Sequence, residues 1–263
     1  MAANTALALT LHDPDGRMHL QARQALPVLN DAFSAICIRA TDSTHPDTLE
    51  AFTTAGAHIN AGPAQVADGE KVGLSRRQAV DLAQQAAPYA LYCDCDRALH
   101  WAQFYPQELK ETAEAVTRHD FTVLGRTARA FDTHPDVQRD TEQIINRVFH
   151  LVSGWDWDVG AGARGLSRAA AQAILTGCPD EELSNDVSWT LYLRSLGCFS
   201  LAYLPTEGLE FETPDRFPQE VQAAGGLEGW LRDFDSDPQR WLDRLELAGG
   251  HLRAMMPFIR KRG

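Results

Sequence analysis

Short apolar runs alternate with segments of helical periodicity over the first 96 residues of the chain. Such runs are typical of strands buried on both faces, and the helical segments between them are typical of crossovers in a parallel sheet. Right-handed crossovers restrict the topology to a doubly wound α/β sheet. The predicted strands are 5–11, 33–40, 57–60 and 89–93, and the predicted helices are 18–29, 46–54 and 75–87, the last capped by Ser75.

The second half of the chain is less regular. Strands are predicted at 121–126 and 199–204, and helices at 106–118, 141–152, 167–175 and 186–196, with Gly197 as the left-handed stop of the last. A glycine-rich segment, 160–165, is interpreted as a loop that leads into the helix at 167. We expect a catalytic domain over 1–205, with a ligand-binding half at 1–96 and a second half at 97–205. A helical C-terminal extension is expected over 206–263.

Charge and hydropathy exclude several partners. The chain has 24 basic and 36 acidic residues, a net charge of −12, which disfavours non-specific binding to nucleic acid or anionic lipid. No apolar stretch approaches the ~20 residues of a membrane span. The amino terminus lacks the positive region of a signal peptide, so we expect a cytoplasmic protein. An odd count of five cysteines argues against a disulfide framework.

Carboxylates follow three of the predicted strands, and ligands bind outside the carboxyl ends of strands in open α/β sheets. These residues are Asp13, Asp15, Asp42, Asp47, Asp94 and Asp96. A row of like charges indicates a divalent cation among them, and oxygen ligands suit magnesium or manganese. In an extended stretch, Asp94 and Asp96 would point to one side while Cys95 pointed into the core. The alternative is a solvated acidic turn.

Four sequence segments resemble, in order, those of family 2 glycosyltransferases of the GT-A type. Asp42 to Glu50 (DSTHPDTLE) follows a predicted strand, and GLSRR at 73–77 opens a helix that leads to the strand ending in Asp94-Cys95-Asp96, the place of the family's Asp-x-Asp motif. Asn185-Asp186 then opens a helix that contains an arginine and ends at a glycine. The resemblance spans about residues 5–205. It implies a mixed, mostly parallel GT-A sheet flanked by helices, a nucleotide-diphosphate sugar donor and Mn²⁺ or Mg²⁺.

The resemblance also implies roles for single residues. Asp42 would contact the nucleotide base or ribose, Arg76 or Arg77 the diphosphate, and Asp94 the ribose. Asp96 would be the stronger metal ligand of the Asp-x-Asp pair. Asp186 would be the catalytic base that deprotonates the acceptor hydroxyl. Similar enzymes recruit a C-terminal histidine to the metal, which makes His251 a candidate ligand.

Two departures from the family pattern put the acceptor and the stereochemistry in question. The acidic pair is Asn185-Asp186 rather than two carboxylates, and the first loop reads HDPDGR. Asp186 could also be only a helix N-cap. Arg76 and Arg77 could be a solvated helix start, although two cations there oppose the helix dipole.

Tryptophans at 155 and 157 have two interpretations, stacking on a sugar or burial in the core. Trp230 and Trp241 could form a self-contact in a homodimer. The expected activity is transfer of a sugar, of the hexosyl class, to a hydroxyl acceptor. The alternatives are a sugar-nucleotide nucleotidyltransferase, for which HDPDGR is a poor phosphate loop, and a non-catalytic binding protein with the same fold.

Overall fold

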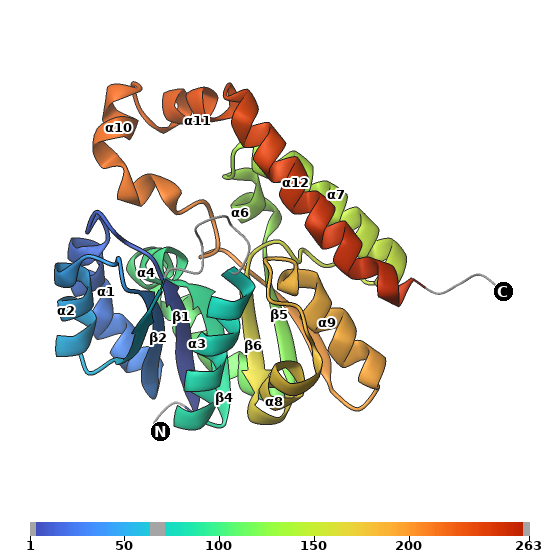
Figure 1. The fold of residues 1–263 in the computed structure, drawn as a ribbon. Helices are drawn as coiled ribbons and strands as arrows, with labels where there is room; N and C mark the ends of the chain where they lie inside the picture. The colour runs from blue at the N-terminus through green and yellow to red at the C-terminus, as the bar shows by residue number, and fades with distance from the viewer. Residues whose placement is uncertain (1–3, 64–71, 260–263) are drawn as a thin grey trace.

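The computed structural model describes residues 4–63 and 72–259, which form a seven-stranded sheet covered by helices on both faces (Figure 1). The strand order is β3-β2-β1-β4-β6-β5-β7, and β6 runs antiparallel to both of its neighbours while every other pair is parallel. The strands are β1 (Thr5–Leu11), β2 (Ala35–Thr41), β3 (His58–Gly62), β4 (Tyr89–Asp94), β5 (Phe121–Arg126), β6 (Ala163–Ser167) and β7 (Leu201–Thr206). The predicted mixed, mostly parallel sheet is confirmed.

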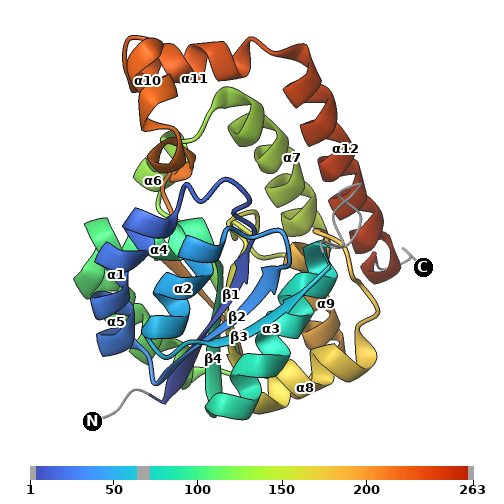
Figure 2. The ribbon, with the colours of Figure 1, turned by 60° about the vertical axis from the view of Figure 1, so that its left-hand side comes forward.

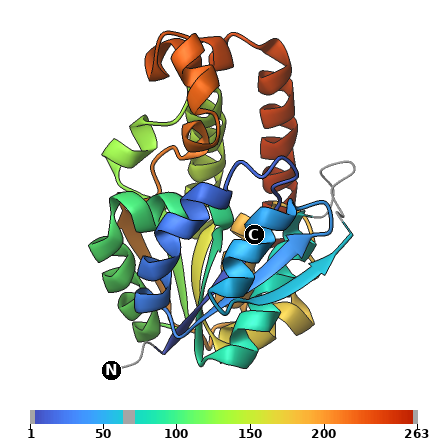
Figure 3. The ribbon, with the colours of Figure 1, turned by 90° about the vertical axis from the view of Figure 1, so that its left-hand side faces the viewer.

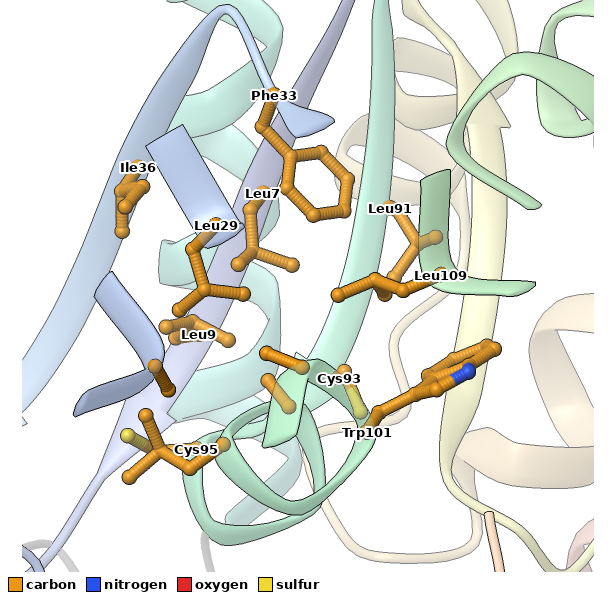
Figure 4. Packing of buried hydrophobic residues seen from close by; sticks show 14 of the residues in the cluster. Leu7, Leu9, Leu29, Phe33, Ile36, Leu91, Cys93, Cys95, Trp101 and Leu109 are labelled. Atoms are coloured by element: carbon orange, nitrogen blue, oxygen red, sulfur yellow. The ribbon is translucent and has the colours of Figure 1, made fainter. Parts of the chain in front are cut away.

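Alternate residues of the central strands feed two separate hydrophobic clusters, as the pleat of a sheet buried on both sides requires. Leu7 and Leu9 of β1 lie in one cluster, with Leu29 and Trp101 from the helices that cover that face (Figure 4). Alanines at positions 6 and 8 face the other cluster, under α3 and α8. The helices are α1 (His19–Ala32), α2 (Pro46–Thr54), α3 (Val72–Ala86), α4 (Cys95–Phe104), α5 (Pro106–Ala115), α6 (Ala128–Asp132), α7 (Asp136–Ser153), α8 (Arg168–Gly177), α9 (Asn185–Leu196), α10 (Pro218–Ala223), α11 (Leu227–Asp235) and α12 (Pro238–Met255).

The glycine-rich segment is not the predicted loop, because its second half is strand β6. All five residues of β6 are buried between β4 and β5. A Cβ at Gly165 would lie 2.4 Å from Cγ1 of Val116, so the glycine lets a helical turn pack directly on the strand. Ser75 is likewise not an N-cap, because α3 already begins at Val72, three residues upstream.

The C-terminal helices pack against the rest of the molecule. Helix α12 lies beside α7 and also contacts α9, while α10 and α11 lie beyond the sheet edge at which β1 ends (Figures 2 and 3). Among the described residues, no helix is both long and apolar enough to span a bilayer. Strand β7 runs parallel to β5. The segment 207–217, between β7 and α10, therefore leaves the sheet at the edge where ligands bind in open α/β folds.

Candidate active site

A cavity of about 310 Å³ lies at the carboxyl ends of β1, β2 and β4. Residues from each of these strand ends line it, together with two side chains from the segment 207–217: they include Thr10, Thr41, Asp94, Asp96, Glu212 and Arg216. The position is the one expected for a ligand site in an open α/β sheet.

The Asp94-Cys95-Asp96 motif is a strand-to-helix turn and not the predicted extended stretch. Asp94 has extended backbone angles (φ −67°, ψ 144°), but α4 begins at Cys95 and holds Asp96 in its first turn. An acidic side chain there is favoured by the helix dipole, which explains the early start of the helix. Both carboxylates nevertheless line the cavity, and Cys95 is buried in the core as predicted.

Asp94 is held by side chains from two strands, β1 and β4, and from helix α3. Its Oδ1 accepts hydrogen bonds from the hydroxyls of Thr10 (2.9 Å) and Tyr92 (2.5 Å). Its Oδ2 lies 3.5 Å from Nη2 of Arg76. These contacts fix the carboxylate in one orientation, with one oxygen turned toward the arginine.

Asp96 faces a second carboxylate, that of Glu212. Burial and the charge of Glu212 raise the pKa of Asp96 to about 6, against the opposing effect of Arg216, whose Nη2 is 3.3 Å from Oδ2 of Asp96. Glu212 in turn places its Oε1 3.5 Å from Nε of Arg97, while its buried Oε2 has no hydrogen-bond partner. Two acidic groups and two arginines thus share one wall of the cavity.

The donor set of this wall suits a hard divalent cation, because carboxylate oxygens are the ligands that Mg²⁺ and Mn²⁺ prefer. In 4–63 and 72–259, however, no three His, Cys, Asp or Glu side chains are grouped as a metal site. Asp96 is paired with Arg216 instead. The carboxylate donors fit such an ion in their chemistry, and a cationic side chain accompanies one of them.

A second cavity, of about 160 Å³, adjoins the first and shares Asp94 and Arg97 with it. Asp186 lines this cavity, with its Oδ1 2.8 Å from Nη1 of Arg76 and 3.5 Å from Nη2 of Arg164. Burial alone would raise the pKa of Asp186, but Arg76 and the other cationic neighbours outweigh it and hold the pKa well below its usual range. Asp186 lies within α9, two residues past the N-cap position, and is not the cap itself.

The two candidate arginines at the start of α3 have different surroundings. Arg76 is buried and bridges Asp94, Asn185 and Asp186. Arg77 instead donates to the carbonyls of residues 174, 175 and 178, at the C-terminal end of α8. The structure thus brings Arg76 to the cavities and uses Arg77 to satisfy the end of a helix.

His251 of α12 also reaches the second cavity. Its Nδ1 lies 2.9 Å from the carbonyl oxygen of Leu247, and a carbonyl can only accept, so Nδ1 donates there. That Nε2 lies 3.6 Å from Oδ2 of Asp186. His251 is therefore beside Asp186, across the shared wall from Asp96.

Asp42 lies at the end of β2 but is exposed, and it lines neither cavity. Its backbone N–H donates to the carbonyl of Gly62. Asp13 is buried as an anchor: its carboxylate accepts from the backbone of Arg17 and Met18 and from the hydroxyl of Thr48. The predicted row of strand-end carboxylates thus reduces to Asp94 and Asp96 at the cavities.

The tryptophans make intramolecular contacts. Trp155 and Trp157 stack on each other at 4.3 Å, and their outer faces are covered by Arg194 and Tyr203. The stacking faces predicted for a sugar are therefore occupied by protein groups. Of the C-terminal pair, Trp230 packs against Phe211, Phe217 and Phe234, and Trp241 donates to the carbonyl of Asp235.

Sequence reasoning missed Arg97, Arg164, Glu212 and Arg216. No sequence pattern points to the last two, because the parallel pairing of β7 with β5, which brings the residues after Thr206 to the ligand-binding edge, is known only from the structure. Arg97 directly follows the Asp-x-Asp pair, and that position is the signal that could have found it. Arg164 lies in β6, where the sequence predicts a loop.

The comparisons with known proteins concern the fold. Neither a protein-family model nor a curated protein matches the sequence. Among solved structures, a mycobacterial protein is similar with a TM-score of 0.53 and 11% identity, over 76% of this chain and 64% of that one. Glucosyl-3-phosphoglycerate synthase from M. tuberculosis is similar with a TM-score of 0.50 and 11% identity, over 77% of this chain and 70% of that one.

This chain thus spans less than two thirds of the mycobacterial protein. At such low identity, the likeness bears on the fold and not on the activity. Together with the strand order and the single antiparallel strand, it shows that the chain has a GT-A type fold.

Proposed function

We propose that the chain is a glycosyltransferase that moves a sugar, of the hexosyl class, from a nucleotide-diphosphate sugar to a small hydroxyl acceptor. The observation that carries the proposal is the junction of two cavities at Asp94 and Arg97, on the ligand-binding edge of a GT-A sheet. A donor in the first cavity and an acceptor in the second would meet at this shared wall. The similar synthase from M. tuberculosis is, by its name, a glucosyl transfer enzyme.

The donor would occupy the 310 Å³ cavity. Arg97 and Arg216 give this cavity the positive charge that a diphosphate needs, and Arg76 approaches from the second cavity. Asp94 would accept from the ribose, as the resemblance implies. Asp42, which is exposed at the end of β2, would contact the base only where the nucleotide extends beyond the cavity.

Asp96 and Asp94 would hold Mn²⁺ or Mg²⁺. When bound, the ion neutralises charge on the departing diphosphate. The chain's own residues bind and orient: Arg97, next to Asp96, lines both cavities and pairs with Glu212. Catalysis then rests on positioning and on charge stabilisation of the leaving group.

The acceptor would lie in the 160 Å³ cavity, which limits it to a small molecule. Asp186 is ionised there because of its cationic neighbours, so it can accept a hydrogen bond from the acceptor hydroxyl and orient it. A carboxylate with so low a pKa is a weak general base, and its proton-accepting role depends on how far Arg76 withdraws. His251, whose Nε2 lies 3.6 Å from Oδ2 of Asp186, would be a second acceptor of that proton or, as the resemblance implies, a ligand of the metal.

Turnover tests the proposal. UDP-, GDP- and ADP-glucose are each incubated with Mn²⁺ and a mixture of small hydroxy acids and polyols, and nucleoside diphosphate release is measured. Asp96→Asn is expected to lower release by about 100-fold or more, since a metal-bound diphosphate depends on it. Asp15→Asn changes an exposed carboxylate that, among the residues the structure describes, pairs only with Arg17; it is the matched control and should be unaffected. If no nucleoside diphosphate is released with any donor and acceptor, the proposed activity is refuted.

A further inference from the structure

The segment 207–217 contributes two side chains, Glu212 and Arg216, to the lining of the 310 Å³ cavity. Its backbone is held at several points. The carboxylate of Glu108 accepts from the N–H groups of Glu207 and Gly208, both at 2.8 Å, and the hydroxyl of Thr133 accepts from that of residue 211. The backbone of the segment is thus held by a residue of α5 and by the residue that directly follows α6.

His100 of α4 fixes the other end of the segment. Its ring lies between two carboxylates, 2.7 Å from Oδ2 of Asp215 and 3.2 Å from Oε1 of Glu210. Asp215 also accepts from Gln21 at 3.0 Å. The residue immediately before Arg216 is therefore anchored to two helices, so the arginine side chain can change its contacts while its backbone stays in place.

Arg216 itself is loosely held. Its side chain is 27% exposed, and within residues 4–63 and 72–259 its single ion pair is the one with Asp96 and its buried Nε has no hydrogen-bond partner. The same side chain lines both the 310 Å³ cavity and an open groove of about 740 Å³ on the α1 side. Space therefore exists on either side of its present position.

A cation is required at this point of the wall. Glu212 is buried and Asp96 is largely buried, with 18% of its side chain exposed; the two carboxylates are close enough to repel each other, and Arg97 already pairs with Glu212. Removing Arg216 would leave the charge of Asp96 uncompensated, which is costly for a buried carboxylate. A divalent ion held by Asp96 would compensate the same carboxylate, so the guanidinium and the ion would compete for it.

We propose that Arg216 is the exchangeable cation of the Asp96 site. In the ligand-free protein it neutralises Asp96; it yields that oxygen to the metal and then pairs with the donor's diphosphate. The guanidinium fork matches two phosphate oxygens at once, which a freed arginine in the donor cavity can use. The inference rests on the proposed function and adds a residue that couples metal binding to donor binding.

Manganese binding, read from the electron paramagnetic resonance signal of free Mn²⁺, tests the exchange without any turnover. Arg216→Gln is expected to bind Mn²⁺ alone about fivefold or more tightly than the wild type, since competition between two cations is a coupling of this order. The same variant should bind UDP, GDP or ADP at saturating Mn²⁺ about fivefold or more weakly. Arg216→Lys keeps the charge, and both of its affinities should fall between those of the wild type and those of Arg216→Gln.

Arg23→Gln is the control, because it removes one positive charge from an exposed site on α1. It should leave both affinities unchanged. If the wild type binds a nucleoside diphosphate with Mn²⁺ and Arg216→Gln changes neither affinity, the exchange is refuted and the proposed function stands. An unchanged diphosphate affinity alone refutes the second half of the exchange. If the wild type binds neither Mn²⁺ nor any of the three diphosphates, the proposed function fails and the exchange fails with it.

Discussion

At the scale of single residues, the candidate site is a set of buried charges that are satisfied by one another. Arg76 lies between Asp94 and Asp186, and Arg164 approaches Asp186 from β6. Removing one member of such a group leaves the others buried without compensation, which costs more than the pair contributes. The adjacent Arg77 makes only hydrogen bonds to carbonyl groups at a helix end.

This contrast predicts different effects of two neighbouring substitutions. Arg76→Gln should lower the free energy of unfolding by about 3–5 kcal/mol, because Asp186 and Asp94 lose their shared counter-ion. Arg77→Gln should lower it by only about 1 kcal/mol, the scale of a lost helix-end contact. Urea denaturation of both variants measures the difference. Equal losses would mean that Arg76 is no more than a helix-surface arginine.

At the scale of elements, β6 depends on a glycine and α12 does not. Gly165→Ala should destabilise the protein by about 1–3 kcal/mol, since its Cβ would overlap Val116. At Gly250, within α12, a Cβ would meet no atom within 4 Å in the described part of the chain, the helix's own backbone aside. Gly250→Ala should therefore stabilise the protein by about 0.5–1 kcal/mol through helix propensity. Thermal unfolding of the two variants would contradict this account if the shifts had the same sign.

The segment 207–217 is predicted to be held more firmly at low pH. Burial by itself would lower the pKa of His100, but the hydrogen bonds and charges of Asp215 and Glu210 raise it above the ordinary value. A raised folded-state pKa contributes stability that is present below the unfolded value, near 6.5, and is lost as pH rises through the folded value. His100→Gln should thus destabilise the protein by about 2 kcal/mol at pH 6 and by less at pH 9.

Denaturation of the His100→Gln variant and the wild type at the two pH values checks this sign. Exposed His119, on the loop before β5, provides the matched control, and His119→Gln should show no such dependence. A loss of stability that is the same at pH 6 and pH 9 would show that the histidine acts by packing alone.

The same elements show what periodicity can predict. Strand β1 and helix α2 have the predicted bounds, and Gly197 ends α9 with a φ of +70°, because strong apolar runs, a proline start and a left-handed stop are local signals. Strand β6 was missed because its short sequence, ARGLS, has no apolar alternation and is held by neighbours on both sides. Helix α4 was missed because the acidic motif was taken as extended.

At the scale of the whole molecule, the site joins parts of the chain that sequence order keeps far apart. Arg76 and Asp186 are 110 residues apart, and the predicted site residues Arg76, Asp94, Asp186 and His251 line one cavity. The order of motifs could predict that these residues belong together. It could not place Glu212 and Arg216, because the return of the segment after β7 depends on tertiary contacts with α4, α5 and α6.

The C-terminal helices are tied to the sheet by further buried ion pairs. Glu142 of α7 pairs with Arg126 at the end of β5 and with Arg244 of α12, and both Glu142 and Arg244 line the second cavity. The helices after residue 205 therefore complete the proposed acceptor site and are not an appendage to it. The 1–205 and 206–263 division remains a prediction about folding units.

The central claim is that a nucleotide-diphosphate sugar binds through a metal held at Asp96. A thermal-shift panel of UDP-, GDP-, ADP- and CMP-sugars, each with and without Mn²⁺, tests it most directly. The account predicts that at least one nucleotide raises the melting temperature only when Mn²⁺ is present, and that Asp96→Ala abolishes the shift. If no nucleotide shifts the melting temperature with or without the metal, or if Asp96→Ala responds like the wild type, the account is contradicted.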